Sequence, residues 1–281
     1  MTEYEISSAI DFAWKWSQSP QTSSYPLYED KRQLEESFTR SICDTSRPLL
    51  GYYKNHQLIA VIQFFFIESK KYLQTSGVYI SADYEEVLEA LISRLRKDYP
   101  HYQALFGFPK ENLNAANYFT QKGYPCVDAC LNMQLKTTDF IAIKPCDGIE
   151  KLEKADFDAY AFFHDQYFSN GYWTSSRLRE VLEKWHIFVY KVDGKIEGSV
   201  FLTTCRDGAL EIFGLLVSKQ YEEADIEASL LSKALSTLFE DNPNIKKTLF
   251  FIDEEATKEL DVAKRVGFYC YSRYRCYEVK L

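Results

Sequence analysis

Several motifs that bind nucleotides or activate nucleophiles are missing from this chain. It contains no G-x-x-x-x-G-K-[ST] loop, no G-x-G-x-x-G fingerprint and no G-x-S-x-G elbow. The first two patterns bring glycine-rich backbone to phosphates, and the third exposes a nucleophilic serine at a sharp turn. The sequence therefore gives no support for nucleotide binding through those loops or for a serine hydrolase.

Cysteine and histidine are present, but they are not spaced as metal ligands. The 7 cysteines include no C-x-x-C pair, and the 4 histidines do not stand at ligand spacing from them. An odd and scattered set favours reduced, buried cysteines over a disulfide framework. We therefore expect a cytoplasmic protein with no metal site.

Long apolar runs and basic runs are also absent. No apolar segment approaches the roughly 20 residues of a membrane span, and residues 1–6 lack the basic region and apolar core of a signal peptide. The net charge is −8, from 41 acidic and 33 basic residues. An acidic chain without basic clusters attracts neither nucleic acid nor an anionic membrane, so we expect neither as a partner.

The chain does contain a repeated pattern of strands and helices. Residues 210–217 form a short apolar run without alternation, which is typical of a strand buried on both faces. Residues 225–240 follow with apolar side chains spaced along one helix face. Such a pair places backbone N–H groups at the helix start, where an anionic ligand can bind. A weaker copy of the pair lies near residues 72–96.

The order of expected elements is the same in both halves of the chain. Each half begins with helices and a hairpin, continues with a strand, a helix and a strand, and closes with a helix and a last strand. The helix before the last strand ends in glycine plus an aromatic residue in both halves, at 123–124 and 267–268. The polar stretch 136–139 lacks periodicity, so we place a boundary there. The sequence thus predicts an α/β protein of two similar domains, 1–136 and 139–281.

This layout resembles the GNAT superfamily of acyl-CoA-dependent N-acetyltransferases, twice over. In the first half, residues 112–124 read N-x-x-A-x-x-x-F-x-x-x-G-Y, which is similar to the family's N-x-x-A-x-x-x-Y-x-x-x-G-F, and the second half keeps Val266-Gly267-Phe268. The resemblance implies two tandem GNAT-like α/β domains, each with a mixed central sheet. It also implies acetyl-CoA or another acyl-CoA as co-substrate, an amine of a small molecule or peptide as acceptor, and no metal.

The resemblance also implies a catalytic base in the second half. Many members carry a glutamate on the central strand, six residues before its last apolar residue, and Glu211 stands in that relation to Val217. Such a carboxylate takes a proton from the substrate amine, often through water. The plain alternative is a strand-end glutamate without a role. In the first half Tyr72 or Gln74 falls at this place, depending on the alignment, and neither is a carboxylate, so we expect that half to be inactive.

A backbone N–H on the same strand is implied to stabilise the oxyanion. The resemblance makes Leu215 this donor, and Gly214 before it is consistent with a bulge or with close packing. The cofactor-binding residues that the resemblance implies are Leu215, Leu216, Val217, Ala224, Asp225, Ile226 and Asn112.

The loop that would hold the CoA pyrophosphate departs from the family pattern. The family has Q/R-x-x-G-x-G/A, whereas residues 222–227 and 83–88 are acidic and contain neither glycine nor a basic residue. Acids in a first helical turn occupy the electrostatic position of an anion. This departure favours the alternative of a catalytically inactive, GNAT-derived binding or interaction module.

The general acid and the acceptor remain open at this level. The family's tyrosine is replaced by Phe119 in the first half and Ala263 in the second, where Tyr269, Tyr271 and Tyr274 are candidate substitutes. Residues 160–173 are dense in aromatic side chains, which either line an acceptor cleft or, as we favour, pack between helices. His164 and Asp165 are neighbours that point to different helix faces, so we expect no catalytic couple.

Overall fold

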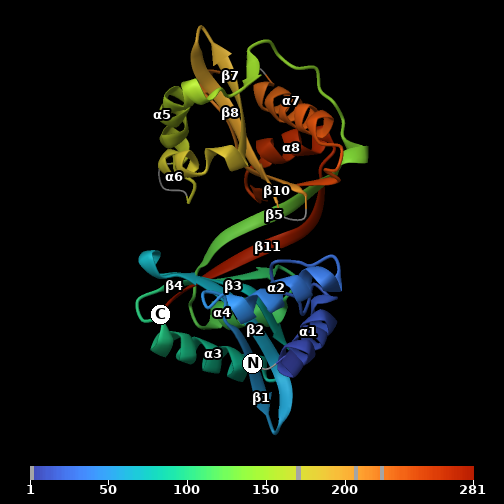
Figure 1. Ribbon diagram of the computed structural model, residues 1–281, viewed down its shortest axis with the longest axis vertical. Helices are drawn as coiled ribbons and strands as arrows, with labels where there is room; N and C mark the ends of the chain where they lie inside the picture. Colours follow the sequence, from blue (N-terminus) through green and yellow to red (C-terminus); the bar gives the residue numbers. More distant parts are fainter. Residues whose placement is uncertain (1–2, 169–171, 206–207, 222–224) are drawn as a thin grey trace. The chain divides into compact units, whose positions relative to one another are not determined.

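The computed structural model describes residues 3–168, 172–205, 208–221 and 225–281 (Figure 1). The chain divides into two compact units, one of residues 1–130 with 273–281 and the other of residues 131–272. Strands β5 (Cys126–Lys136) and β11 (Tyr269–Lys280) each belong partly to one unit and partly to the other. The last residues of the chain therefore complete the first unit.

The first unit is a mixed sheet with helices on both faces. Its strands lie in the order β1 (Leu49–Lys54), β2 (Gln57–Ile67), β3 (Tyr72–Ile80), β4 (Gln103–Pro109) and β11. Only β3 and β4 are parallel among the pairs β1–β2, β2–β3, β3–β4 and β4–β11. Its helices are α1 (Glu3–Ser17), α2 (Lys31–Cys43), α3 (Tyr84–Asp98) and α4 (Leu113–Gln121), with the 3-10 turn η1 (Glu68–Lys70).

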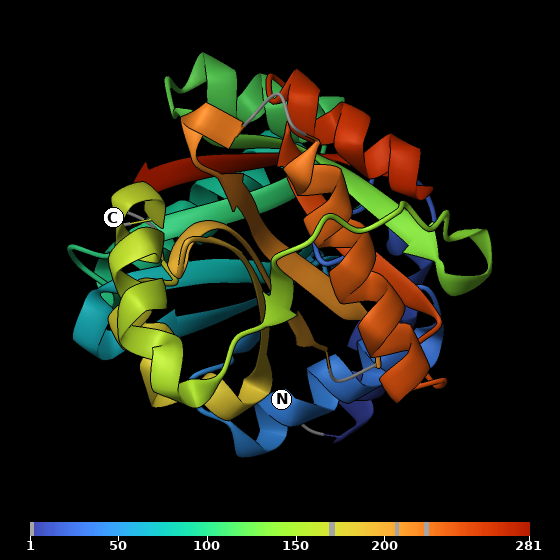
Figure 2. The same cartoon turned by 90° about the horizontal axis from the view of Figure 1, so that it is seen from above.

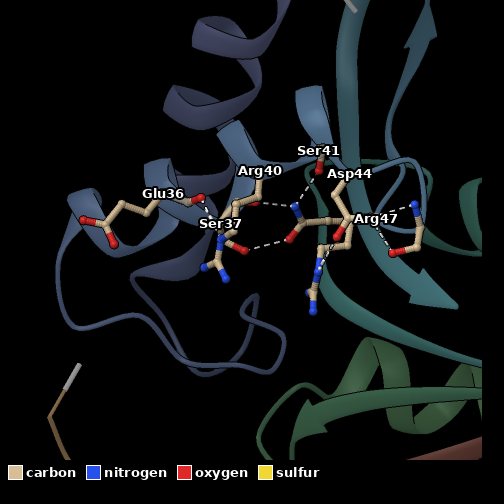
Figure 3. Close-up of polar contacts among 8 residues, drawn as sticks. Glu36, Ser37, Arg40, Ser41, Asp44 and Arg47 are labelled. Atoms are coloured by element: carbon tan, nitrogen blue, oxygen red, sulfur yellow. Dashed lines mark hydrogen bonds and ion pairs between the residues drawn. The ribbon is translucent and has the colours of Figure 1, made fainter. Parts of the chain in front are cut away.

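Two apolar cores hold these layers together. Helices α3 and α4 pack on one sheet face and α1 and α2 on the other. One buried amide fixes α2 to β2, because Gln63 donates to Ser37 O at 2.9 Å and to Ser41 Oγ at 2.8 Å, and accepts from Ser37 Oγ at 2.9 Å (Figure 3). These bonds offset the cost of burying the amide and set how α2 lies on the sheet.

The second unit repeats the plan. Its strands lie in the order β5, β10 (Lys247–Asp253), β9 (Leu210–Val217), β8 (Lys195–Thr204), β7 (Trp185–Val192) and β6 (Ile149–Lys151). Its helices are α5 (Phe157–Phe168), α6 (Ser175–Glu180), α7 (Ile226–Asp241) and α8 (Thr257–Val266). The 3-10 turns are η2 (Thr137–Asp139), η3 (Lys154–Asp156), η4 (Leu182–Lys184) and η5 (Lys219–Tyr221).

Each face of this second sheet carries its own core. Helices α7 and α8 pack on one face and α5 and α6 on the other, as Figures 1 and 2 show. The apolar face predicted for α7 is buried, because Ile226, Leu230, Leu231 and Leu235 all lie in the core. The mixed α/β fold predicted from the sequence is thus confirmed. Among the described helices, none is long and apolar enough to span a membrane.

Candidate functional site

A β-bulge interrupts β9 beside its glycine. Phe201 of β8 is opposite Gly214, whereas the next residue, Leu202, is opposite Ile212, so Phe213 is the extra residue. An added Cβ on Gly214 would lie 2.5 Å from ring atoms of both Phe168 and Phe201, so no larger residue fits. The bulge and the close packing, left as alternatives for this glycine in the sequence, are both present.

Strands β9 and β10 pair only at their beginnings. Their parallel register joins Leu210, Glu211 and Ile212 to residues 248–250, although β9 continues to Val217 and β10 to Asp253. The two strands share no ladder pair beyond Ile212 within these fully described segments. The backbone groups of residues 213–217 that face β10 are therefore outside this ladder.

Glu211 lies at the closed end of this divergence. Its neighbours Leu210 and Ile212 point into the core under α7 and α8. Because side chains alternate along a strand, Glu211 faces the opposite side, together with Phe213. The half-buried carboxylate accepts a hydrogen bond from Cys205 Sγ at 3.4 Å. The carboxylate thus lies two residues before the bulge, on the side of α5 and α6.

His164 anchors the aromatic cluster on that side. It is fully buried, with Nδ1 2.9 Å from Tyr160 Oη and Nε2 2.7 Å from the carbonyl oxygen of Trp173. A carbonyl only accepts, so Nε2 carries the proton and Nδ1 accepts from the tyrosine hydroxyl. Burial lowers the pKa of His164, which keeps the ring neutral at pH 7. The ring stacks on Phe168 with centroids 4.9 Å apart.

Packing explains much of the aromatic stretch. Tyr160 and Phe163 are buried in the core, and Phe168 and Trp173 pack against it. The side chains on the outer side of the stretch are exposed, and they are Phe162, Tyr167 and Tyr172. Asp165 accepts hydrogen bonds from the backbone N and Oγ of Ser175. The side-chain hydrogen bonds of His164 thus go to Tyr160 and Trp173, and those of Asp165 go to Ser175.

Ion pairs occupy the beginning of α7. Asp225 precedes the helix in left-handed backbone, with φ 59°, and its two carboxylate oxygens each accept from one Nη of Arg265 at 2.6 Å. Glu227 in the first turn pairs with Lys258 at 2.8 Å. Asp225 and Glu227 therefore pair with basic side chains of α8. Sequence reasoning missed both basic residues, because they lie 31 and 40 residues further along the chain.

The other residues predicted to bind the cofactor lie on β9, around the start of α7 and in the first unit. Leu215 and Val217 are buried and Leu216 is half-buried on β9, while Ile226 is buried at the start of α7. Ala224 lies outside the described residues. Asn112 belongs to the first unit, where its Oδ1 caps α4 through Ala115 N and its Nδ2 donates to Ser23 O.

The first unit repeats the bulge and the divergence. Strand β3 pairs with β2 through Thr75 and Gly77 but skips Ser76, and its parallel pairing with β4 covers only residues 72–74. Aligning Gly77 with Gly214 places Gln74 where the second unit has Glu211. The sequence left Tyr72 and Gln74 as alternatives, and the bulge selects Gln74.

In the first unit, side chains and a loop occupy the place where β3 and β4 diverge. Ser24 Oγ and Tyr25 N both donate to Gly107 O at 3.0 Å. Thr75 Oγ1 donates to Leu105 O and accepts from Gly107 N, both at 3.4 Å. These bonds engage both backbone groups of Gly107 and the carbonyl oxygen of Leu105 on β4.

Tyr274 closes the same place from β11. An added Cβ on Gly107 would lie 2.9 Å from its ring, and its ring meets Tyr25 edge to face at 4.7 Å. Tyr274 thus belongs to the first unit, whereas Tyr269 and Tyr271 lie in the second and are exposed. Only three residues, 81–83, link β3 to α3, against the eight residues 218–225 before α7.

Solved structures share this fold at low sequence identity. A GCN5-related N-acetyltransferase from Sphaerobacter thermophilus has a TM-score of 0.71 and 13% identity, over 98% of this chain and 91% of that one. A tandem GNAT protein from the clavulanic acid biosynthesis pathway has a TM-score of 0.60 and 12% identity, over 99% and 96%. A putative acetyltransferase from Pyrococcus horikoshii has 0.58 and 11%, over 100% and 88%.

No family model and no curated protein matches the sequence. The structural likeness nevertheless extends over almost the whole chain, and one of the similar structures is itself a tandem protein. The resemblance drawn from residues 112–124 and 211–217 is confirmed at the level of the fold. The chain therefore has the GNAT acyl-CoA N-acyltransferase fold, in a tandem arrangement.

Proposed function

We propose that the second unit is an N-acyltransferase that moves an acetyl or other acyl group from acyl-CoA to an amine of a small molecule or peptide. The observation that carries this proposal is Glu211, a half-buried carboxylate two residues before the bulge where β9 and β10 stop pairing. A base, a set of backbone groups outside the ladder and an aromatic acceptor side meet there.

The reaction follows from that placement. Glu211 takes a proton from the substrate amine, directly or through one water, and the amine nitrogen attacks the thioester carbonyl carbon. In the proposal the N–H of Leu215 donates to the developing oxyanion, a contribution of a few kcal/mol, about 3, to the barrier. The C–S bond then breaks, the acyl group stays on nitrogen, and the CoA thiolate leaves and takes a proton. Transfer is direct, without a covalent enzyme intermediate.

We assign the first unit a structural role without chemistry. Gln74 replaces the base, and the backbone of β4 is bonded to Ser24, Tyr25 and Thr75. The connection before α3 is also short, at three residues. The pantetheine chain of an acyl-CoA could enter this unit only by displacing these contacts. We therefore propose a single active site, in the second unit.

One observation favours the second candidate, an inactive module that binds a partner. Asp225 holds the guanidinium of Arg265 where a pyrophosphate would need a cation. Against this, β9 and β10 diverge after Ile212, and the second unit has an acid at position 211. In the first unit, by contrast, side chains and a loop occupy the equivalent divergence. An unused site has no physical reason to keep both features, so we favour the enzyme.

Titration calorimetry of acetyl-CoA into the full chain tests the proposal first, followed by release of free thiol with a panel of amines. We expect micromolar binding and an acceptor-dependent thiol release. Glu211→Gln should lower that rate about 10²- to 10⁴-fold and leave the affinity for acetyl-CoA unchanged. No binding at millimolar acetyl-CoA would refute the acetyl-CoA version, and an unchanged rate in Glu211→Gln would remove this residue from the mechanism.

A further inference from the structure

The aromatic rings at the bulge face the position that the acyl group would take. We propose that Phe168 and Phe201 limit the acyl donor of the second unit to a short chain, acetyl or propionyl. This inference rests on the proposed function and assigns the two rings as the residues that set donor length. It rests on the packing around Gly214, on the contacts that hold the two rings, and on the point where β9 and β10 stop pairing.

Both rings press on the backbone of Gly214. An added Cβ there would lie 2.5 Å from Phe168 Cζ and 2.5 Å from Phe201 Cε1, closer than real contacts come. The rings meet edge to face, with centroids 5.3 Å apart and an angle of 84°. Gly214 supplies the carbonyl half of the peptide whose N–H belongs to Leu215. A thioester bound to that N–H therefore has both rings as its nearest wall on the α5 side.

The Phe168 ring is held in place by buried polar contacts. It stacks on His164 at 4.9 Å, and both nitrogens of that histidine are bonded, to Tyr160 Oη and Trp173 O. Phe201 is 1% exposed and also meets the histidine ring, at 5.1 Å. Moving Phe168 aside would lose this stacking on a buried histidine whose two nitrogens are both bonded.

Two more boundaries limit the space for the acyl chain. The divergence ends where Ile212 pairs with Phe250, two residues before Gly214, which is about 7 Å along the strand. On the opposite sheet face, Ile212 and Leu215 are packed in the core under α7 and α8. An acyl chain that starts at Leu215 N–H thus meets rings, core and the strand junction within a few carbon atoms.

The test compares the affinities of CoA, acetyl-CoA, propionyl-CoA, butyryl-CoA and hexanoyl-CoA for the full chain by titration calorimetry. We expect the wild type to bind hexanoyl-CoA about tenfold or more weakly than acetyl-CoA, because each excluded methylene has a large effect in a closed pocket. Phe168→Ala should abolish or reverse this preference by strengthening hexanoyl-CoA at least tenfold, with CoA itself unchanged. Phe168→Leu, which keeps an apolar side chain, should shift the optimum to butyryl-CoA and tests the proposal if the alanine variant does not fold.

Matched controls come from the same helix. Phe162→Ala removes an exposed ring, 76% accessible. Phe163→Ala opens a cavity in the same core, whereas the atoms nearest to an added Cβ on Gly214 belong to Phe168 and Phe201. Neither should change the order of the acyl-CoA affinities. An equal affinity of the wild type for acetyl-CoA and hexanoyl-CoA, or an unchanged order in both Phe168 variants, overturns the donor limit and leaves the proposed function intact. If CoA and every acyl-CoA fail to bind, the proposed function and this inference both fall.

Discussion

Asp225 and Arg265 form a two-pronged ion pair at the beginning of α7, with both Nη–Oδ distances at 2.6 Å. The guanidinium lowers the pKa of Asp225, so the carboxylate is charged at neutral pH. A carboxylate in this position takes the place of an external anion at a helix start. Under the proposed function, the pair lies where the pyrophosphate of acyl-CoA would bind.

Asp225→Asn should strengthen acetyl-CoA binding by the second unit. Asparagine tolerates the left-handed backbone at this position but removes the charge that competes for Arg265. Because the pair is partly exposed, we expect a modest gain of about two- to fivefold at low salt, shrinking as salt rises. Titration calorimetry at two ionic strengths measures it.

Asp83→Asn is the matched control for that variant. Asp83 precedes α3 in the same left-handed backbone, with φ 52°, and pairs with Lys54 at 2.7 Å in the first unit. Since this unit is closed, its substitution should leave acetyl-CoA affinity unchanged. Weaker binding by Asp225→Asn would show that this carboxylate supports the cofactor site instead of competing within it.

Glu259 makes the stability of the second unit depend on pH. Burial, and then the charges of Glu227 and Asp253, raise the pKa of Glu259 to about 7. In the unfolded chain this carboxyl titrates near its ordinary value, about 4.3. Between about pH 4.3 and 7 the folded state holds the proton more tightly, so the free energy of unfolding falls as pH rises through this window.

Glu259→Gln should remove this dependence, because the amide cannot ionise. At pH 8 the variant should be more stable than the wild type by about 2 kcal/mol, and at pH 4 the two should be similar. Urea unfolding followed by tryptophan fluorescence at several pH values measures the difference. Glu255→Gln changes an exposed neighbour and should keep the wild-type pH profile. Equal stability of Glu259→Gln and the wild type at pH 8 would contradict the raised pKa.

The last strand of the chain should be essential for the first unit. Tyr277 of β11 stacks on Phe119 of α4 with centroids 4.8 Å apart and an angle of 9°, and it is 6% exposed. Tyr277→Ala leaves a cavity in that core, so we expect a loss of about 3 kcal/mol in the free energy of unfolding. Tyr271→Ala, on the same strand but 46% exposed, should change it by less than about 0.5 kcal/mol. Urea unfolding of both variants measures the difference, and equal losses would contradict the predicted contribution of Tyr277 to this core.

Local pattern predicted the elements of this fold well. The mostly apolar run 210–217 is β9, the helical spacing after it is α7, and Gly214 marks the bulge. These features follow from the periods of strands and helices and from the space that only glycine leaves. They needed no knowledge of which elements meet.

Contacts between distant residues could not be predicted in this way. The periodicity of 257–266 identifies a helix but does not indicate that Arg265 reaches Asp225. The alternation near 274 indicates a strand, whereas its neighbour is β4 of the first unit, 165 or more residues earlier in the chain. The Ser24–Tyr25 loop carries no periodic pattern, so its bonds to Gly107 had no sequence signal.

Introducing a glutamate at position 74 of the first unit should not recover the activity that Glu211→Gln loses. In the double variant Glu211→Gln with Gln74→Glu, the acid stands at the equivalent place of the other bulge. Its surroundings remain closed, since Gln74 accepts from Tyr72 Oη at 2.5 Å and the strand beside it is bonded to Ser24 and Tyr25. We expect the thiol-release rate of the double variant to equal that of Glu211→Gln alone, with an unchanged far-ultraviolet circular dichroism spectrum. A rate that returns toward the wild type would mean that the first unit admits acyl-CoA, because a base contributes only where both substrates can reach it.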